Sequence, residues 1–81
     1  MYEDILNKKV LITGSSSGIG FEIAKSFSDA GAFVVLNGRN KNKLEKAAKH
    51  VLNSKTIYGN VEDSKVAKKI VSKAVFLLKG L

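Results

Sequence analysis

The sequence predicts an α/β fold in which three parallel strands alternate with three helices. Three short runs of strand-forming residues, at 10–13, 33–36 and 56–58, are each followed by apolar residues at helical spacing. This alternation is typical of right-handed β-α-β crossovers, which generate a parallel sheet. We expect one sheet with the strand order 3-2-1.

The first unit begins with the apolar run Val10-Leu11-Ile12-Thr13, which suits a strand buried on both faces. A Gly-Ser stretch, residues 14–18, interrupts the pattern, and Gly31 provides a stop for the helix that follows. The side chains expected to face the sheet from this helix are Ile19, Ile23, Ala24, Phe27 and Ala30, and Phe21 is also expected to pack.

The second unit has a wholly apolar strand, Phe33–Leu36, that breaks at Asn37-Gly38. Asn40 is of a type that caps a helix. The apolar stripe of that helix contains Leu44, Ala47, Ala48 and Val51, and we interpret His50 near its end as a surface residue.

The third unit has the shortest strand, Thr56–Tyr58, and Asp63 or Ser64 is expected to cap its helix. The apolar side of this helix is predicted to contain Val66, Ala67, Ile70, Val71, Ala74, Val75 and Leu78. The outward side is predicted to contain Lys65, Lys68, Lys69 and Lys73.

The composition is that of one small globular domain. The chain has 81 residues, of which 44% are hydrophobic and 26% charged, which excludes a disordered tail. It has no Cys, which excludes disulfides, thiolate metal sites and thiol nucleophiles and favours a cytoplasmic location. No apolar run is long enough to be a signal peptide or to span a membrane.

The charge is unevenly distributed along the chain. The net charge is +7, and all of it falls in residues 41–81, where ten Lys accompany Glu45, Glu62 and Asp63. A basic surface can bind nucleic acid or anionic membranes. These cations are all Lys, with few aromatic residues among them. The side chains that recognise bases by paired hydrogen bonds, or stack on them, are therefore scarce. We interpret them as a solvated surface in preference to a nucleic-acid site.

The segment with the clearest chemistry is the loop Thr13-Gly14-Ser15-Ser16-Ser17-Gly18-Ile19-Gly20. Glycines between a buried strand and a helix allow a tight turn, close approach to a pyrophosphate and close helix packing. The free N–H groups of the first helical turn would then face the anion. The loop therefore predicts dinucleotide binding, with the serines as hydrogen-bonding residues. No Gly-Lys-Ser or Gly-Lys-Thr follows, so a P-loop is excluded.

This spacing, Thr13-Gly14-x-x-x-Gly18-Ile19-Gly20, resembles the glycine motif of the short-chain dehydrogenase/reductase family. Asn60-Val61, after the third strand, matches the dipeptide of that family's adenine pocket. The resemblance covers nearly the whole chain and is greatest to bacterial 3-oxoacyl-acyl carrier protein reductases, which act in fatty acid biosynthesis. It implies that residues 1–81 form a single truncated Rossmann domain whose partner is a nicotinamide dinucleotide.

The residues after the second strand favour NADP over NAD. NAD-using members of the family typically place Asp where this chain has Gly38, and the guanidinium of Arg39 suits a 2′-phosphate. Many NADP-using members also have a basic residue where this chain has Ser17. The expected cofactor-binding residues are thus the whole loop from Thr13 to Gly20 with Arg39, Asn60 and Val61.

The family's Tyr-x-x-x-Lys pair is missing from the sequence, because Tyr2 is followed four residues on by Leu6 and Tyr58 by Glu62. The first hypothesis is therefore an NADP-binding N-terminal segment of an enzyme that reduces a 3-oxoacyl thioester or similar carbonyl with NADPH. The alternative is an inactive truncated or split fragment that acts only by pairing with another chain. An open edge on the first strand would favour a homo-oligomer or recruitment of a missing C-terminal half. A third possibility is a basic surface-binding module.

Overall fold

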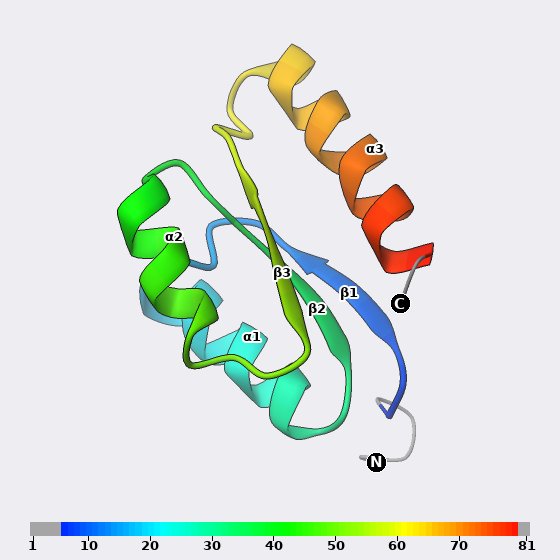
Figure 1. The fold of residues 1–81 in the computed structure, drawn as a ribbon. Coiled ribbons are helices and arrows are strands. Elements are labelled where there is room, and N and C mark those ends of the chain that lie inside the picture. Colours follow the sequence, from blue (N-terminus) through cyan, green and yellow to red (C-terminus); the bar gives the residue numbers. More distant parts are fainter. Residues whose placement is uncertain (1–5, 80–81) are drawn as a thin grey trace.

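A computed structural model describes residues 6–79 of the chain, so Tyr2 lies outside the described residues. The chain alternates strands and helices in the predicted order (Figure 1). The elements are β1 (Lys9–Ile12), α1 (Gly18–Asp29), β2 (Phe33–Gly38), α2 (Lys41–Ala48), β3 (Ser54–Tyr58) and α3 (Ser64–Lys79).

The three strands form one parallel sheet in the order β1-β2-β3, which confirms the predicted α/β fold. Leu11 pairs with Val35, and Leu36 pairs with Thr56. Helices α1 and α2 cover one face of the sheet and α3 covers the other (Figure 1). The architecture is that of a partial Rossmann fold, with the carboxyl ends of all three strands at one edge of the sheet.

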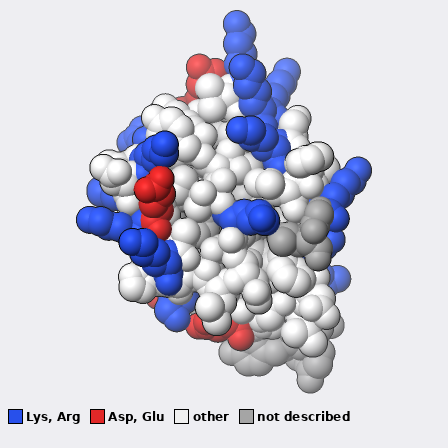
Figure 2. All heavy atoms as spheres, viewed as in Figure 1, with Lys and Arg blue, Asp and Glu red and all other residues white. Residues whose placement is uncertain are grey.

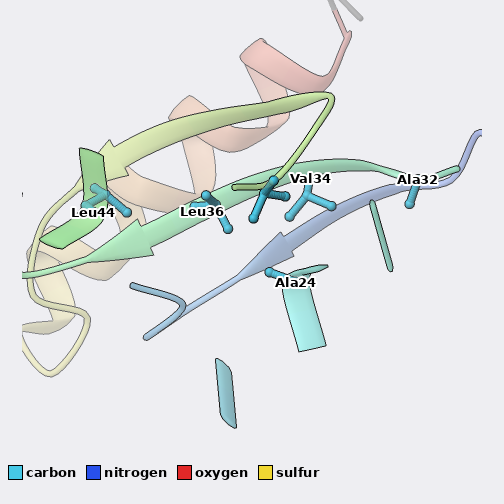
Figure 3. Close-up of a cluster of buried hydrophobic side chains, with 6 residues drawn as sticks. Ala24, Ala32, Val34, Leu36 and Leu44 are labelled. Atoms are coloured by element: carbon cyan, nitrogen blue, oxygen red, sulfur yellow. The ribbon is translucent and has the colours of Figure 1, made fainter. Parts of the chain in front are cut away.

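The core consists of two apolar clusters, one on each face of β2. Val34 and Leu36 point toward α1 and α2, where they join Ala24 and Leu44 (Figure 3). Val35 points to the opposite face. There it joins Ile57, Ile70 and Ala74 beneath α3. Because side chains alternate along a strand, an apolar run such as β2 can fill both clusters at once.

Two of the three helices begin with the predicted side-chain caps. Asn40 Oδ1 accepts a hydrogen bond from Lys43 N at 3.0 Å. Asp63 Oδ1 accepts from Lys65 N at 2.9 Å, so Asp63, not Ser64, caps α3. These side chains satisfy N–H groups that the first turn of a helix leaves without a partner.

The burial of the first strand and of two helix faces differs from expectation. β1 is only half-buried, because it lies at the edge of the sheet in the described part of the chain. Ile19 and Ile23 were expected to face the sheet but are 80% and 44% exposed. In α3, Val71 and Val75 are exposed in the same way. The apolar arc of each helix is wider than the strip that a three-stranded sheet can cover.

The Lys-rich surface is dispersed over α2 and α3. In Figure 2 the cationic side chains project from several parts of the surface and do not merge into one continuous patch. The four predicted outward lysines of α3 are all exposed: Lys65, Lys68, Lys69 and Lys73. Within residues 6–79, no helix is both long and apolar enough to cross a membrane.

Candidate functional site

The loop between β1 and α1 has a backbone that only glycine adopts easily. Gly14 and Gly18 have φ values of 60° and 63°, in the left-handed region. A Cβ at either position would have no neighbouring atom within 4 Å. The two glycines are therefore required by backbone conformation, and the space beside them is open to a ligand.

Gly20, the third glycine of the loop, is required because there is no space for a side chain at this position. A Cβ at Gly20 would collide with the carbonyl group of Gly14. The first turn of α1 thus lies directly against the turn that ends β1. This contact points the N-terminus of α1 toward the carboxyl edge of the sheet.

Helix α1 begins without the side-chain cap that α2 and α3 have. Ser17 occupies the N-cap position with extended backbone, and its side chain makes no capping hydrogen bond. The first turn contains no acidic residue. The N–H groups of this turn and the positive end of the helix dipole are therefore available to an external anion.

The glycine loop forms one wall of a pocket of ≈ 260 Å³ at the carboxyl edge of the sheet. We call this hollow the strand-end pocket, because it receives residues that follow all three strands. It is lined by Gly14, Ser16, Ser17, Arg39, Gly59, Asn60, Val61 and Glu62. The structure thus brings together six of the residues predicted from sequence, and adds Gly59 and Glu62.

The other predicted residues lie around this pocket without lining it. Thr13 and Gly18 are exposed at the two ends of the loop. Ile19 projects into solvent, and Gly20 packs against Gly14. Ser15 is fully buried, and its hydroxyl donates to Ile12 O at 2.7 Å. That hydroxyl faces inward, beneath the loop.

Arg39 and Glu62 face each other across the pocket. Arg39 Nη1 lies 4.0 Å from Glu62 Oε1, and both side chains are largely exposed, at 70% and 79%. Exposed ion pairs of this kind contribute little, about 0–1 kcal/mol. The guanidinium is therefore free to exchange this carboxylate for another anion. Glu62 is not predicted as a site residue from sequence, because its place depends on the turn in which Glu62 N donates to Asn60 Oδ1 at 3.0 Å.

A second hollow, of ≈ 320 Å³, lies on the other side of the same serines. It is lined by Ser16, Ser17, Phe21, Lys43, Lys46, Ala47 and His50. None of these residues is acidic, so the positive charge of the two lysines is not neutralised within the hollow. Within the described part of the chain, no group of three metal-ligating side chains occurs.

Comparison with known proteins identifies relatives over most of the chain. The family model described as short chain dehydrogenase matches residues 8–81. Sorbose reductase sou1 of Schizosaccharomyces pombe is 44% identical over 78 residues, which are 90% of this chain and 31% of the relative.

Two bacterial proteins show the same pattern. The 3-oxoacyl-[acyl-carrier-protein] reductase FabG of Rickettsia conorii is 38% identical over 72 residues, 88% of this chain and 30% of the relative. The uncharacterized oxidoreductase YciK of Escherichia coli is 46% identical over 50 residues, 60% of this chain and 20% of the relative. The chain therefore spans less than a third of the length of these relatives.

Proposed function

Since the chain belongs to the short-chain dehydrogenase family, we propose that it binds the adenosine and pyrophosphate portions of NADP. The observation that carries the proposal is the strand-end pocket, where the glycine loop, Arg39 and Asn60-Val61 meet. When bound, NADPH supplies a hydride for carbonyl reduction. The residues of this chain bind and orient the cofactor.

The backbone of the glycine loop holds the pyrophosphate in this proposal. The open space beside Gly14 and Gly18 admits the anion, and the uncapped N–H groups of Gly18, Ile19 and Gly20 receive it. The hydroxyls of Ser16 and Ser17 line the pocket and add hydrogen bonds. Ser15 supports the loop from beneath through its hydrogen bond to Ile12 O, and Thr13 begins the loop.

Arg39 selects the 2′-phosphate. Its planar guanidinium binds phosphate with two parallel hydrogen bonds, and Gly38 places no carboxylate there to repel the ligand. Lys43 and Lys46 border the neighbouring hollow behind Ser17. Their positive potential compensates for the absence of a basic side chain at position 17.

Asn60 and Val61 form the adenine side of the site. Val61 is 36% exposed at the wall of the pocket and presents an apolar surface to a base. The turn that Asn60 makes with Glu62 fixes the direction of this wall. The absence of cysteine from the sequence agrees with a cytoplasmic setting for such an enzyme.

The reaction itself requires groups that this sequence does not contain, because neither tyrosine is followed by the Lys of the family's catalytic pair. We propose that a full-length protein containing this segment reduces a 3-oxoacyl thioester or a similar carbonyl with NADPH. The similarity to a 3-oxoacyl-[acyl-carrier-protein] reductase supports this substrate class. In such a protein, residues beyond this segment would bind substrate and move the proton.

A titration of NADPH and NADH into the chain, followed by cofactor fluorescence, tests the choice of cofactor. We expect saturable binding with NADPH preferred. Arg39→Asp should weaken NADPH binding by tenfold or more, about 1.4 kcal/mol, because a charge-assisted contact becomes a repulsion. Arg39→Lys should retain part of the preference. Equal affinities for both cofactors in the wild-type chain would contradict the assignment of NADP.

The alternative function, in which the chain acts only by pairing with another chain, is favoured by one observation. β1 lies at the edge of the sheet in the described residues, so its outer backbone groups are open to another strand. Sedimentation velocity over a range of concentrations tests this alternative. A stable monomer that binds NADPH would reject it, whereas a dimer or larger species without cofactor binding would support it.

A further inference from the structure

We propose that Asn37 is a positioning residue that holds the two walls of the strand-end pocket at a fixed separation. The inference rests on the proposed NADP site and concerns how that site keeps its shape. One wall is the glycine loop after β1, and the other is the segment 59–61 after β3. Asn37 lies between them, near the end of β2, and is 1% exposed.

The side chain of Asn37 contacts both walls. Its Nδ2 donates hydrogen bonds to Ile57 O at 3.0 Å and to Gly59 O at 3.2 Å. Its Oδ1 accepts from Gly14 N at 3.4 Å. Both N–H groups and the carbonyl oxygen of the amide are therefore used, which satisfies a polar group that is costly to bury.

The backbone of Asn37 adds a second set of contacts to the glycine loop. Ser15 N donates to Asn37 O at 2.8 Å, and Asn37 N donates to Ser15 Oγ at 2.9 Å. The single proton of the Ser15 hydroxyl goes to Ile12 O. Ser15 thereby joins the end of β1 to Asn37, which explains why this serine is fully buried in a loop whose other residues are exposed or half-buried.

The two walls have no direct hydrogen bond to each other among residues 6–79. Gly59 N donates to Gly38 O at 3.0 Å, so the third strand also reaches the loop only through β2. Asn37 is thus the side chain through which Gly14 and Gly59 are linked. A ligand that touches both walls at once depends on this link, whereas a ligand that touches one wall does not.

Asn37→Asp is the sharpest test of this role. The carboxylate has nearly the same shape and still accepts from Gly14 N, but it cannot donate to Ile57 O or Gly59 O. The probes are NADPH, which reaches both walls, inorganic pyrophosphate for the loop alone, and adenosine 2′-monophosphate for Arg39 and segment 59–61. Affinities are corrected for the folded fraction, measured by urea denaturation of each variant.

We expect Asn37→Asp to weaken NADPH binding by about tenfold while each fragment changes by about twofold or less, because pre-organisation matters most to the ligand that spans the site. Ser15→Ala is a milder change at the same link, because it removes the hydroxyl that accepts from Asn37 N. It should also weaken the binding of NADPH more than the binding of either fragment. Two controls separate this effect from others. Asn42→Asp adds the same charge on exposed α2, and Val35→Ala destabilises β2 away from the pocket.

A purely structural role for Asn37 predicts a different result. All three uncorrected affinities would then weaken by the same factor, as in Val35→Ala. After correction for the folded fraction, NADPH would show no larger loss than the two fragments, and the proposal would be overturned. Unchanged NADPH binding in both Asn37→Asp and Ser15→Ala would also overturn it. If Asn37→Asp does not fold, the loss of NADPH affinity in Ser15→Ala, compared with the losses for the two fragments, decides between the two roles. A wild-type chain that binds none of the probes would refute the proposed NADP site, and with it this role.

Discussion

Gly20 illustrates how a missing side chain can set the position of a helix. A Cβ at this position would collide with the Gly14 carbonyl, so Gly20→Ala must push α1 away from the loop. Overpacking costs about 1–3 kcal/mol, which exceeds the gain in helix propensity of about 1 kcal/mol. We predict that Gly20→Ala lowers the free energy of unfolding, measured by urea denaturation, and weakens NADPH binding.

Ser26→Ala is the matched control for this prediction, because Ser26 lies on the exposed side of the same helix. Its effect on stability should stay within about 0.5 kcal/mol. A Gly20→Ala chain as stable as Ser26→Ala would show that α1 does not need its close approach to Gly14.

At the level of single residues, the sequence predicted those parts of the site that depend on the backbone. The glycine spacing predicted a tight turn after the first strand whatever the neighbouring side chains are, and the structure shows that Gly14 and Gly18 have left-handed backbone there. Glu62 and Asn37 could not be predicted in the same way. Their positions depend on the register of β2 with β3 and on one turn after β3.

The side chain of Asn40 leads to a prediction about the stability of helix α2. This side chain caps α2 through the N–H of Lys43, and removing the cap should cost about 1 kcal/mol. Asn40→Ala should therefore lower the urea midpoint without changing the slope of the transition. Asn42→Ala, within the same helix, should be neutral or slightly stabilising because it only raises helix propensity. Equal losses in the two variants would contradict the capping role.

The difference in burial between the two faces of α3 leads to a second prediction about a helix. Ile70 is 2% exposed, whereas its neighbour Val71 is 53% exposed. Ile70→Val should thus cost about 0.5–1.5 kcal/mol, and Val71→Ala should change stability by less than about 0.5 kcal/mol. Urea denaturation of both variants measures the difference. A larger loss for Val71→Ala would mean that the opposite face of α3 is covered.

The type and order of the elements followed from local sequence, but the burial of their faces did not. Helical spacing identified α3, yet it counted Val71 and Val75 as inward because both belong to an apolar arc. How much of that arc is covered depends on the width of the sheet. The same reason explains β1, whose apolar sequence fits a strand with neighbours on both sides while the described sheet provides only one.

For the whole molecule, the uneven charge predicts the effect of salt. The chain has a net charge of +7, and the ion pairs within residues 6–79 join only Lys25 to Asp29 and Arg39 to Glu62. The lysines of α2 and α3 therefore have no ion-pair partner among these residues. Screening should reduce the repulsion among the lysines of α2 and α3. We predict that NaCl raises stability by on the order of 1 kcal/mol, or about 4–8 °C in Tm for a domain of this size.

Lys68→Glu gives the matched comparison, because it lowers the net charge by two units on the exposed side of α3. The increase of Tm with salt should be smaller in this variant. A Tm that falls as salt is added to the wild-type chain would show instead that favourable ion pairs dominate its electrostatics.

We propose that the glycine loop and the segment after β3 bind one dinucleotide between them. The most direct test is a titration of NADPH into the ¹⁵N-labelled chain, followed by the shifts of assigned backbone amides. We predict saturable shifts that are largest in residues 14–20 and 59–61 and at Arg39, which surround the strand-end pocket. Shifts confined to the lysine face of α3, or no saturable shift in a folded chain, would contradict the claim.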